Sequence, residues 1–159
     1  MSTQYPGTPA REIPADVKIA IAAASFNETI VEELLRGCLD RLKQLGIEGT
    51  RVQVHRVPGA FELPLAAKVL AQTKRFGAVI CLGAVVRGET PHFDYVAGEA
   101  ARGIAAVSLS EKLPVIFGVL TTNDQKQAWD RCGGQHGHAG VRAAEAAVEM
   151  ICMIRKAGK

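Results

Sequence analysis

The sequence predicts a single α/β domain with a doubly wound, parallel sheet of four strands. Apolar runs rich in β-branched residues alternate with amphipathic segments, and no internal repeat or low-complexity segment appears. The amphipathic segments are about a dozen residues long, the length of helices that connect parallel strands. Such alternation is typical of sheets with helices on both faces. The 159 residues are enough for one domain with its own core.

The N-terminal part of the chain divides into an arm and the start of the sheet. Residues 1–16 contain three prolines and no periodicity, which predicts an extended arm before a domain of residues 17–159. The stretch VKIAIAAAS, residues 17–25, alternates as a strand does. Thr29 and Glu32 have the spacing of a capping box at the start of a helix, which we expect to end at Gly46.

Three further strands and their helices follow. RVQVHRV (51–57) predicts the second strand, and the helix expected over 60–74 places Leu65, Val69 and Leu70 inward. AVICLGAVV (78–86) has the unbroken apolar character of a central strand that is covered on both faces. A helix over 93–110 and the strand PVIFGVLT (114–121) come next.

The C-terminal part is predicted to be helical. Asn123 is the expected cap of the short helix DQKQAWDR, and GGQHGHAG (133–140) is a glycine-rich turn between helices. The last amphipathic helix is expected over 141–155.

Composition excludes several classes of function. The net charge is only +3 with no Lys/Arg run, which argues against a nucleic-acid partner. The N-terminus lacks the apolar core of a signal peptide, and no apolar run is long enough to span a membrane, so a cytoplasmic protein is expected. The four cysteines contain no C-x-x-C pair, which favours buried thiols in a reducing compartment.

Neither a metal nor an organic cofactor is expected. Cys132, His136 and His138 match no standard zinc spacing. No G-x-G-x-x-G follows the first strand, which argues against a dinucleotide.

Polar and aromatic residues collect where the predicted strands end. They are Ser25-Phe26-Asn27 after the first strand, 58–62 after the second, 87–92 after the third, and 121–123 after the fourth. Open α/β sheets bind ligands beyond the carboxyl ends of their strands, so we expect the functional site there.

The loop after the third strand contains the residues best suited to chemistry. Gly88 and Thr90 lie just before a helix start, where backbone N–H groups bind anions; the alternative is that Thr90 only caps the helix. His92 follows in the first turn, and imidazole titrates near neutrality, which suits proton transfer; the alternative is a surface histidine.

Other loop residues allow two interpretations each. Phe26 and Phe61 can stack on a planar heterocycle or seal the edge of the core. Glu62 can accept hydrogen bonds from a polyol or favour a helix start. Arg131, at the entrance of the glycine-rich turn, is a candidate anion clamp.

Four segments together resemble one enzyme family. They are GAFELP, GAVVRGETPHFDYV, PVIFGVLTT and WDRCGGQHGHAG, and the sequence is similar to 6,7-dimethyl-8-ribityllumazine synthases from about residue 17 to residue 155. The resemblance implies a flavodoxin-like, three-layer α/β/α fold with a four-stranded parallel sheet. It also implies condensation of 5-amino-6-(D-ribitylamino)uracil with 3,4-dihydroxy-2-butanone 4-phosphate, the penultimate step of riboflavin biosynthesis, without metal or organic cofactor.

The resemblance also implies roles for individual residues. His92 is implied as the proton-transfer residue. Implied to bind the pyrimidine and its ribityl chain are Phe26, Asn27, Ala60, Phe61, Glu62, Ala84, Val85 and Val86, together with Phe117 from a neighbouring subunit. Implied to bind the butanone phosphate and its phosphate group are Gly88, Glu89, Thr90 and Arg131.

The chain departs from the family pattern in the turn after Arg131. Many members have a lysine there near the phosphate, whereas this chain has Gln135, His136, His138 and Ala139; either histidine is a candidate replacement for that charge, unless Arg131 suffices alone. The family forms pentamers with active sites shared between subunits. The short turn favours an icosahedral shell of pentamers, with the arm pairing with a neighbour's sheet.

Two other functions fit the same sequence. One is an archaeal-type riboflavin synthase, which dismutates two lumazines. The other is a non-catalytic shell protein that binds flavin or phosphate. The phosphate-directed Gly88-Glu89-Thr90 and the titrating His92 favour lumazine synthesis over both.

Overall fold

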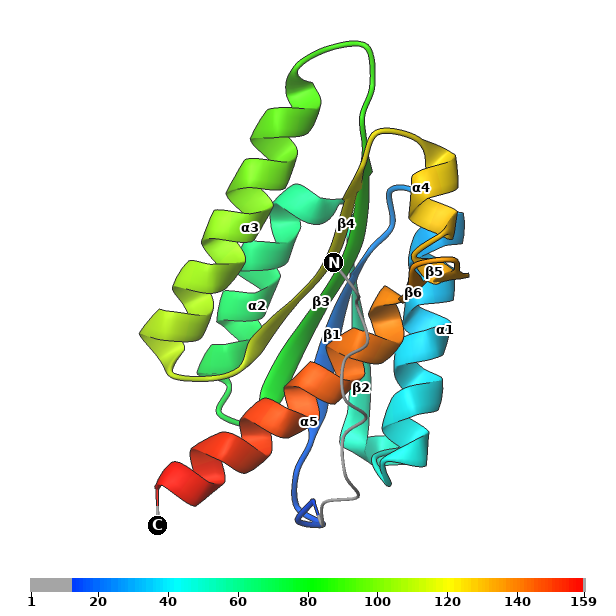
Figure 1. Cartoon of the computed structure of the whole chain (residues 1–159). Coiled ribbons are helices and arrows are strands. Elements are labelled where there is room, and N and C mark those ends of the chain that lie inside the picture. The colour runs from blue at the N-terminus through cyan, green and yellow to red at the C-terminus, as the bar shows by residue number, and fades with distance from the viewer. Residues whose placement is uncertain (1–12, 159) are drawn as a thin grey trace.

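A four-stranded parallel sheet forms the centre of the computed structural model, which describes residues 13–158 (Figure 1). Its strands are β1 (Ile19–Ala24), β2 (Val52–Val57), β3 (Ala78–Val86) and β4 (Val115–Thr122). Their order across the sheet is β2-β1-β3-β4, with every pairing parallel. The predicted fold class is confirmed.

Helices cover both faces of the sheet (Figure 1). Helices α1 (Glu28–Gln44) and α5 (Ala139–Ala157) lie on one face, and α2 (Leu63–Gln72) and α3 (His92–Glu111) on the other. Two apolar clusters result, one on each face, because alternate residues of β1 and β3 point to opposite sides. All six residues of β1 are buried, as expected for a strand inside a covered parallel sheet.

Short elements complete the chain. They are the 3₁₀ turns η1 (Gly49–Arg51) and η2 (Ala60–Glu62), the helix α4 (Gln125–Trp129), and the strands β5 (Cys132–Gly134) and β6 (Gly137–His138). The segment GGQHGHAG is therefore mostly an antiparallel hairpin between α4 and α5, rather than the plain turn that its glycines suggested. Gly133 and Gly137 supply its positive φ angles of 103° and 75°.

Two predicted helix caps are wrong. Helix α1 begins at Glu28 after Asn27, whose φ of 56° is left-handed, so Thr29 lies inside the helix and forms no capping box. Asp124, not Asn123, caps α4, with its side chain accepting a hydrogen bond from the Gln127 amide. Gly46 does follow the end of α1, with a φ of 81°.

Helix α2 is apolar on two faces. Leu65 and Val69 were expected to point inward, but their side chains are 70% and 57% exposed. Leu70, the third residue expected to point inward, does fill the core, together with Leu63 and Ala67. Phe61, Leu65 and Val69 form an exposed apolar stripe at helical spacing. The helical period alone does not tell such a stripe from the face that packs in the core.

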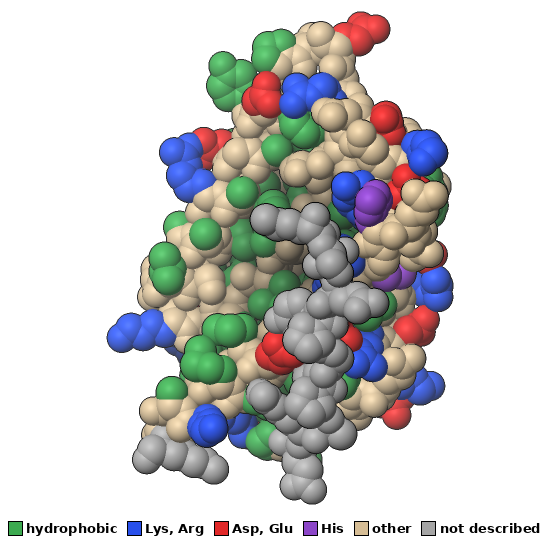
Figure 2. Space-filling view, viewed as in Figure 1, with side chains coloured by type: hydrophobic (Ala, Val, Ile, Leu, Met, Phe, Trp, Pro, Cys, Tyr) green, Lys and Arg blue, Asp and Glu red, His purple; other side chains and the backbone are tan. Residues whose placement is uncertain are grey.

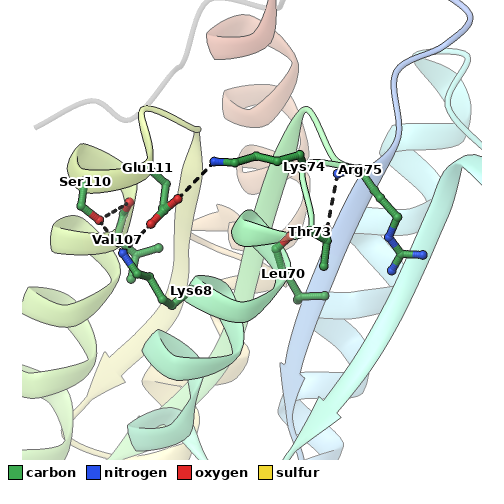
Figure 3. Close-up of polar contacts among 8 residues, drawn as sticks. All are labelled: Lys68, Leu70, Thr73, Lys74, Arg75, Val107, Ser110 and Glu111. Atoms are coloured by element: carbon green, nitrogen blue, oxygen red, sulfur yellow. Dashed lines mark hydrogen bonds and ion pairs between the residues drawn. The ribbon is translucent and has the colours of Figure 1, made fainter.

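Polar contacts join the C-terminal ends of α2 and α3 (Figure 3). Lys68 pairs with Glu111 and donates a hydrogen bond to the Ser110 hydroxyl at 3.2 Å, and the Lys74 ammonium lies 3.4 Å from the Glu111 carboxylate. The hydrogen bond from Lys68 lowers the pKa of Glu111. These contacts fix the end of the helix pair opposite to the one where α3 begins.

No helix within residues 13–158 is both long and apolar enough to cross a membrane. The predicted arm lies largely outside the described residues, so its division from the domain stays a prediction.

Candidate functional site

A cavity of about 700 Å³ opens where β1, β2 and β3 end and α3 begins. It is lined by Phe26, Asn27, Pro58, Gly59, Ala60, Phe61, Glu62, Ala84, Val85, Val86, Gly88, Thr90, His92, Phe93, Tyr95 and Val96. We call it the first cavity. The first cavity lies at the switch point of the sheet, where the direction of chain progression reverses. The chain passes from β1 to β2 on one side of β1, and β3 pairs with β1 on the other side.

Asn27 links the two sides of this switch point. Its side-chain amide donates a hydrogen bond of 2.8 Å to the Ala84 carbonyl of β3. The backbone nitrogens of Ser25 and Phe26 donate to carbonyls of Val57 and Pro58, beside β2. The loop after β1 is thus tied to both neighbouring strands, which fixes the position of Phe26.

The two phenylalanines do not seal the core. Phe26 is 71% exposed and Phe61 is 56% exposed, and both line the first cavity. Exposed aromatic side chains beside a cavity offer faces for stacking against a planar ring. Gly59 leaves room beside them, since a Cβ atom there would lie 3.3 Å from a Glu62 carboxylate oxygen.

His92 is the first residue of α3, exposed and lining the same cavity as Gly88 and Thr90. Pro91, not Thr90, occupies the cap position, and no side chain there accepts a hydrogen bond from the helix start. The cap interpretation of Thr90 is therefore wrong, and its side chain is left at the cavity. An imidazole and helix-start residues consequently share one rim.

Arg87 holds this loop in place. Its guanidinium lies 4.3 Å from the centre of the Phe93 ring, donates to the Asn123 side-chain oxygen at 3.1 Å, and lies 3.5 Å from the Asp94 carboxylate. The Arg87 amide also donates to the Thr122 carbonyl of β4 at 2.8 Å. These contacts join the loop to β4 and to the first turn of α3.

A second cavity, of about 420 Å³, lies along β4 and the start of α5. Its lining consists of residues 116–121 of β4 with Arg131, Ala139, Arg142, Ala143 and Ala146. Figure 2 shows hydrophobic side chains in a hollow over β4, between α3 and α5. Phe117 lies here and is 45% exposed although it belongs to a strand.

The structure therefore divides the predicted site residues. Those of the loops after β1, β2 and β3 meet in the first cavity, except Glu89, which is exposed and lines neither cavity. Phe117 and Arg131 lie together in the second cavity.

Sequence reasoning missed several lining residues. Tyr95 and Val96 follow His92 by three and four positions, so helical spacing could have found them. Pro58, Gly59 and Phe93 adjoin residues that were named. No sequence pattern indicates that Arg142 lines the second cavity, because the hairpin between Arg131 and Arg142 brings both residues to it.

Both histidines of the hairpin were candidates to replace a phosphate-site lysine, with Arg131 alone as the alternative. His138 packs against Gly37 of α1, where a Cβ atom would lie 2.1 Å from the ring. Its Nδ1 accepts a hydrogen bond of 3.2 Å from the Gly140 amide, and burial lowers its pKa despite the Glu33 carboxylate at 3.7 Å. His136 is exposed, and neither histidine lines the first or the second cavity.

Thiols and metal ligands contribute no further site. Burial raises the pKa of Cys38 and of Cys81 to about 12 and that of Cys132 to about 11, so these thiols stay protonated at neutral pH. Within residues 13–158, no three His, Cys, Asp or Glu side chains are placed to hold a metal ion.

Comparison with known proteins places the chain in a family. The family model of 6,7-dimethyl-8-ribityllumazine synthase matches residues 16–155. A 6,7-dimethyl-8-ribityllumazine synthase of Syntrophus aciditrophicus (strain SB) is 52% identical over 149 residues, which cover 94% of this chain and 97% of that protein. The matched region includes every strand and both cavities, and the chain belongs to the 6,7-dimethyl-8-ribityllumazine synthase family.

Proposed function

We propose that the first cavity is the active site in which this family member condenses 5-amino-6-(D-ribitylamino)uracil with 3,4-dihydroxy-2-butanone 4-phosphate. The products are 6,7-dimethyl-8-ribityllumazine, phosphate and water, and the reaction is the penultimate step of riboflavin biosynthesis. The observation that carries the assignment is the shared rim: His92, Gly88 and Thr90 line one cavity with two exposed phenylalanine rings.

The residues that line the first cavity suit both parts of the pyrimidine substrate, its planar ring and its ribityl chain. Phe26 stacks on the planar ring, and residues of β3, from Ala84 to Val86, contact its edge through backbone groups. Asn27, Ala60, Phe61 and Glu62 hold the ribityl chain, with the Glu62 carboxylate accepting hydrogen bonds from its hydroxyls.

The butanone phosphate binds beside His92. Gly88, Glu89 and Thr90 contact it from the loop before α3, where the helix-start amides favour negative charge. Gly88 and Thr90 line the first cavity, whereas Glu89 lines neither cavity in a single chain.

His92 serves the proton transfers. The substrate amine attacks the ketone, and the carbinolamine loses water to form an imine. Phosphate is then eliminated, and the second substrate nitrogen attacks the remaining carbonyl carbon, so that ring closure releases a second water. Each step moves a proton to or from a substrate atom, and an imidazole can both donate and accept near neutral pH. Holding both reactants in one cavity contributes a further part of the rate.

A second copy of the chain completes the site. Phe117 and Arg131 line the second cavity, along the β4 edge, and no residue lines both cavities. We therefore place Phe117 of a neighbouring copy over the pyrimidine and Arg131 of that copy on the phosphate. The exposed stripe of Phe61, Leu65 and Val69 supports such docking, because burial of neighbouring apolar side chains against a partner is favourable.

We extend this proposal to the number of chains in the assembly and to the location of the protein in the cell. A pentamer follows from the family resemblance, and an icosahedral shell from the short turn after Arg131. Light scattering checks both: a pentamer has about five times the 16.9 kDa mass of one chain, and a shell is a far heavier particle. The cytoplasmic location stays a prediction.

A product assay tests the function. Purified protein is mixed with both substrates, and lumazine absorbance is followed with phosphate release measured in parallel. We expect both products in equal amounts. Riboflavin formed from lumazine alone would instead identify a riboflavin synthase, and binding without turnover would identify a passive binding protein.

His92→Ala tests the role of the imidazole. We expect kcat to fall about 10²- to 10⁴-fold, the usual contribution of a positioned acid–base group, while the KM of each substrate changes little. His92→Gln retains hydrogen bonding without titration and should be equally slow. Unchanged turnover in both variants would reject the role of His92.

A further inference from the structure

Two arginines share the second cavity. Arg131 lies between α4 and β5, and Arg142 lies in the first turn of α5, yet both line the same 420 Å³ space. The hairpin β5–β6 brings them together. Gly137 in that hairpin leaves room for the Arg142 side chain, since a Cβ atom at residue 137 would lie 2.9 Å from its Nη1.

Arg142 occupies a position that is unfavourable for a cation on its own. The start of a helix carries partial positive charge, and α5 has no acidic residue in its first turn to offset it. Among the described residues, neither Arg131 nor Arg142 forms an ion pair with a carboxylate. An anion bound in the cavity would neutralise both guanidinium groups.

Each guanidinium is also positioned by a backbone carbonyl. Arg131 Nη1 donates to the Gln127 carbonyl at 2.9 Å, and Arg142 Nη1 donates to the His136 carbonyl at 3.1 Å. A guanidinium has five N–H donors, so one such bond fixes the group and leaves donors for a ligand. Both residues are half-buried, and the hydrogen bond of Arg131 is more buried than that of Arg142, which is exposed.

The negative charge of the phosphate substrate exceeds the single positive charge of Arg131. A phosphate monoester carries about −1.5 to −2 charges near pH 7, and bidentate guanidinium groups are well suited to bind it. The chain has no lysine in the turn after Arg131. His138 cannot replace it, because that ring is packed on Gly37 and caps α5.

We propose that Arg142 is the second phosphate-binding cation of this enzyme and replaces the absent lysine. This proposal rests on the proposed function. It adds to the phosphate site a residue of α5, Arg142, which lies about one helical turn after Ala139. The phosphoryl group lies between the two guanidinium groups. Because a guanidinium does not titrate near neutrality, phosphate affinity does not depend on a histidine.

Steady-state kinetics with Arg142→Gln test the proposal. We expect the KM of the butanone phosphate to rise about tenfold to a hundredfold, as for the loss of a hydrogen bond to a charged group, with the KM of the pyrimidine unchanged. Arg142→Lys should recover part of the loss. Arg102→Gln, at an exposed arginine of α3 that pairs with Glu99, is the matched control and should behave as wild type.

Calorimetric titration with inorganic phosphate, at fixed ionic strength, separates this proposal from the proposed function. The Kd of phosphate should be higher for Arg142→Gln than for the wild type. If that rise is found but the wild type forms no lumazine, only the proposed function is refuted. Lumazine formation with an unchanged phosphate-substrate KM in Arg142→Gln would overturn the proposal and leave the function standing. A loss of affinity in His136→Gln but not in Arg142→Gln would also overturn it, as would absence of phosphate binding by the wild type.

Discussion

Two histidines of this chain lie in opposite environments. His92 is exposed at a cavity rim, whereas His138 is packed on Gly37 with Glu33, Arg36 and Arg142 around it. The position of His92 could be predicted from sequence, because residues that directly follow a buried strand lie at one edge of the sheet. The position of His138 could not, since Gly37 lies far away in sequence on another helix.

The burial of His138 makes stability depend on pH. Its pKa is lowered in the folded state, first by burial, with Arg36 and Arg142 adding to the effect and Glu33 opposing it. As pH falls through about 6.5, the ordinary value for histidine, the unfolded chain takes up this proton before the folded chain does. The His138 contribution to folding stability is therefore lost as pH falls below about 6.5.

Urea unfolding of wild type and His138→Asn at pH 7.5 and pH 5.5 measures this effect. The wild type should lose more free energy of unfolding between the two pH values than the variant does. Asparagine retains a cap acceptor for α5 without a titrating ring. Equal losses in the two proteins would show that His138 does not govern the pH dependence.

At the scale of elements, hydrophobic periodicity located the strands and main helices, but not the residues that cap the starts of α1 and α4. Asn27 illustrates the reason, because its side chain bonds to Ala84 across the sheet instead of capping α1. The contacts of α1 with the hairpin and with the start of α5 are likewise non-local. Gly37 and Gly140 permit it, since a Cβ atom at residue 140 would lie 2.0 Å from the Leu34 carbonyl.

A pair of glycine substitutions tests this close contact. Gly37→Ala should lower the free energy of unfolding by roughly 2 kcal/mol, because its Cβ atom would collide with the His138 ring. Gly98→Ala is the control in α3, with nothing within 4 Å of the new atom, and should raise stability by up to about 1 kcal/mol. Denaturant unfolding measures both, and a stabilised Gly37→Ala would contradict the packing described.

The ion pair between α1 and α5 gives a second prediction at this scale. Arg41 lies 2.9 Å from the Glu145 carboxylate, and their side chains are 23% and 11% exposed. Arg41→Met leaves that carboxylate without its partner and should cost roughly 2 kcal/mol of unfolding free energy. The double variant Arg41→Met, Glu145→Gln should regain part of the loss, and no recovery would argue against the pairing.

For the whole molecule, the sequence was sufficient for the sheet and for the first cavity, because both follow from the alternation of strands and helices. It was not sufficient for surfaces that lack a partner within one chain. Leu65 and Val69 have the spacing of core residues but lie exposed, and Phe117 lies exposed on β4. Patterns of apolar residues do not distinguish burial in a fold from burial between copies.

These exposed surfaces lead to the central claim, which is that one active site is built from two copies. Under the proposed function, His92 of one chain would act in the first cavity, while Arg131 of its neighbour would bind the phosphate. In that case, each site takes its His92 from one chain and its Arg131 from the neighbouring chain. An assembly that mixes His92→Ala chains with Arg131→Ala chains therefore contains several kinds of site. Some sites then contain neither defect.

Co-expression of His92→Ala and Arg131→Ala chains with different tags, followed by purification through both tags, measures this directly. Random assembly of equal amounts into a closed ring leaves about one quarter of the sites intact. We predict that the mixed assembly recovers about a quarter of wild-type lumazine synthesis, well above either variant alone. Activity no higher than the average of the two variants would contradict the shared site.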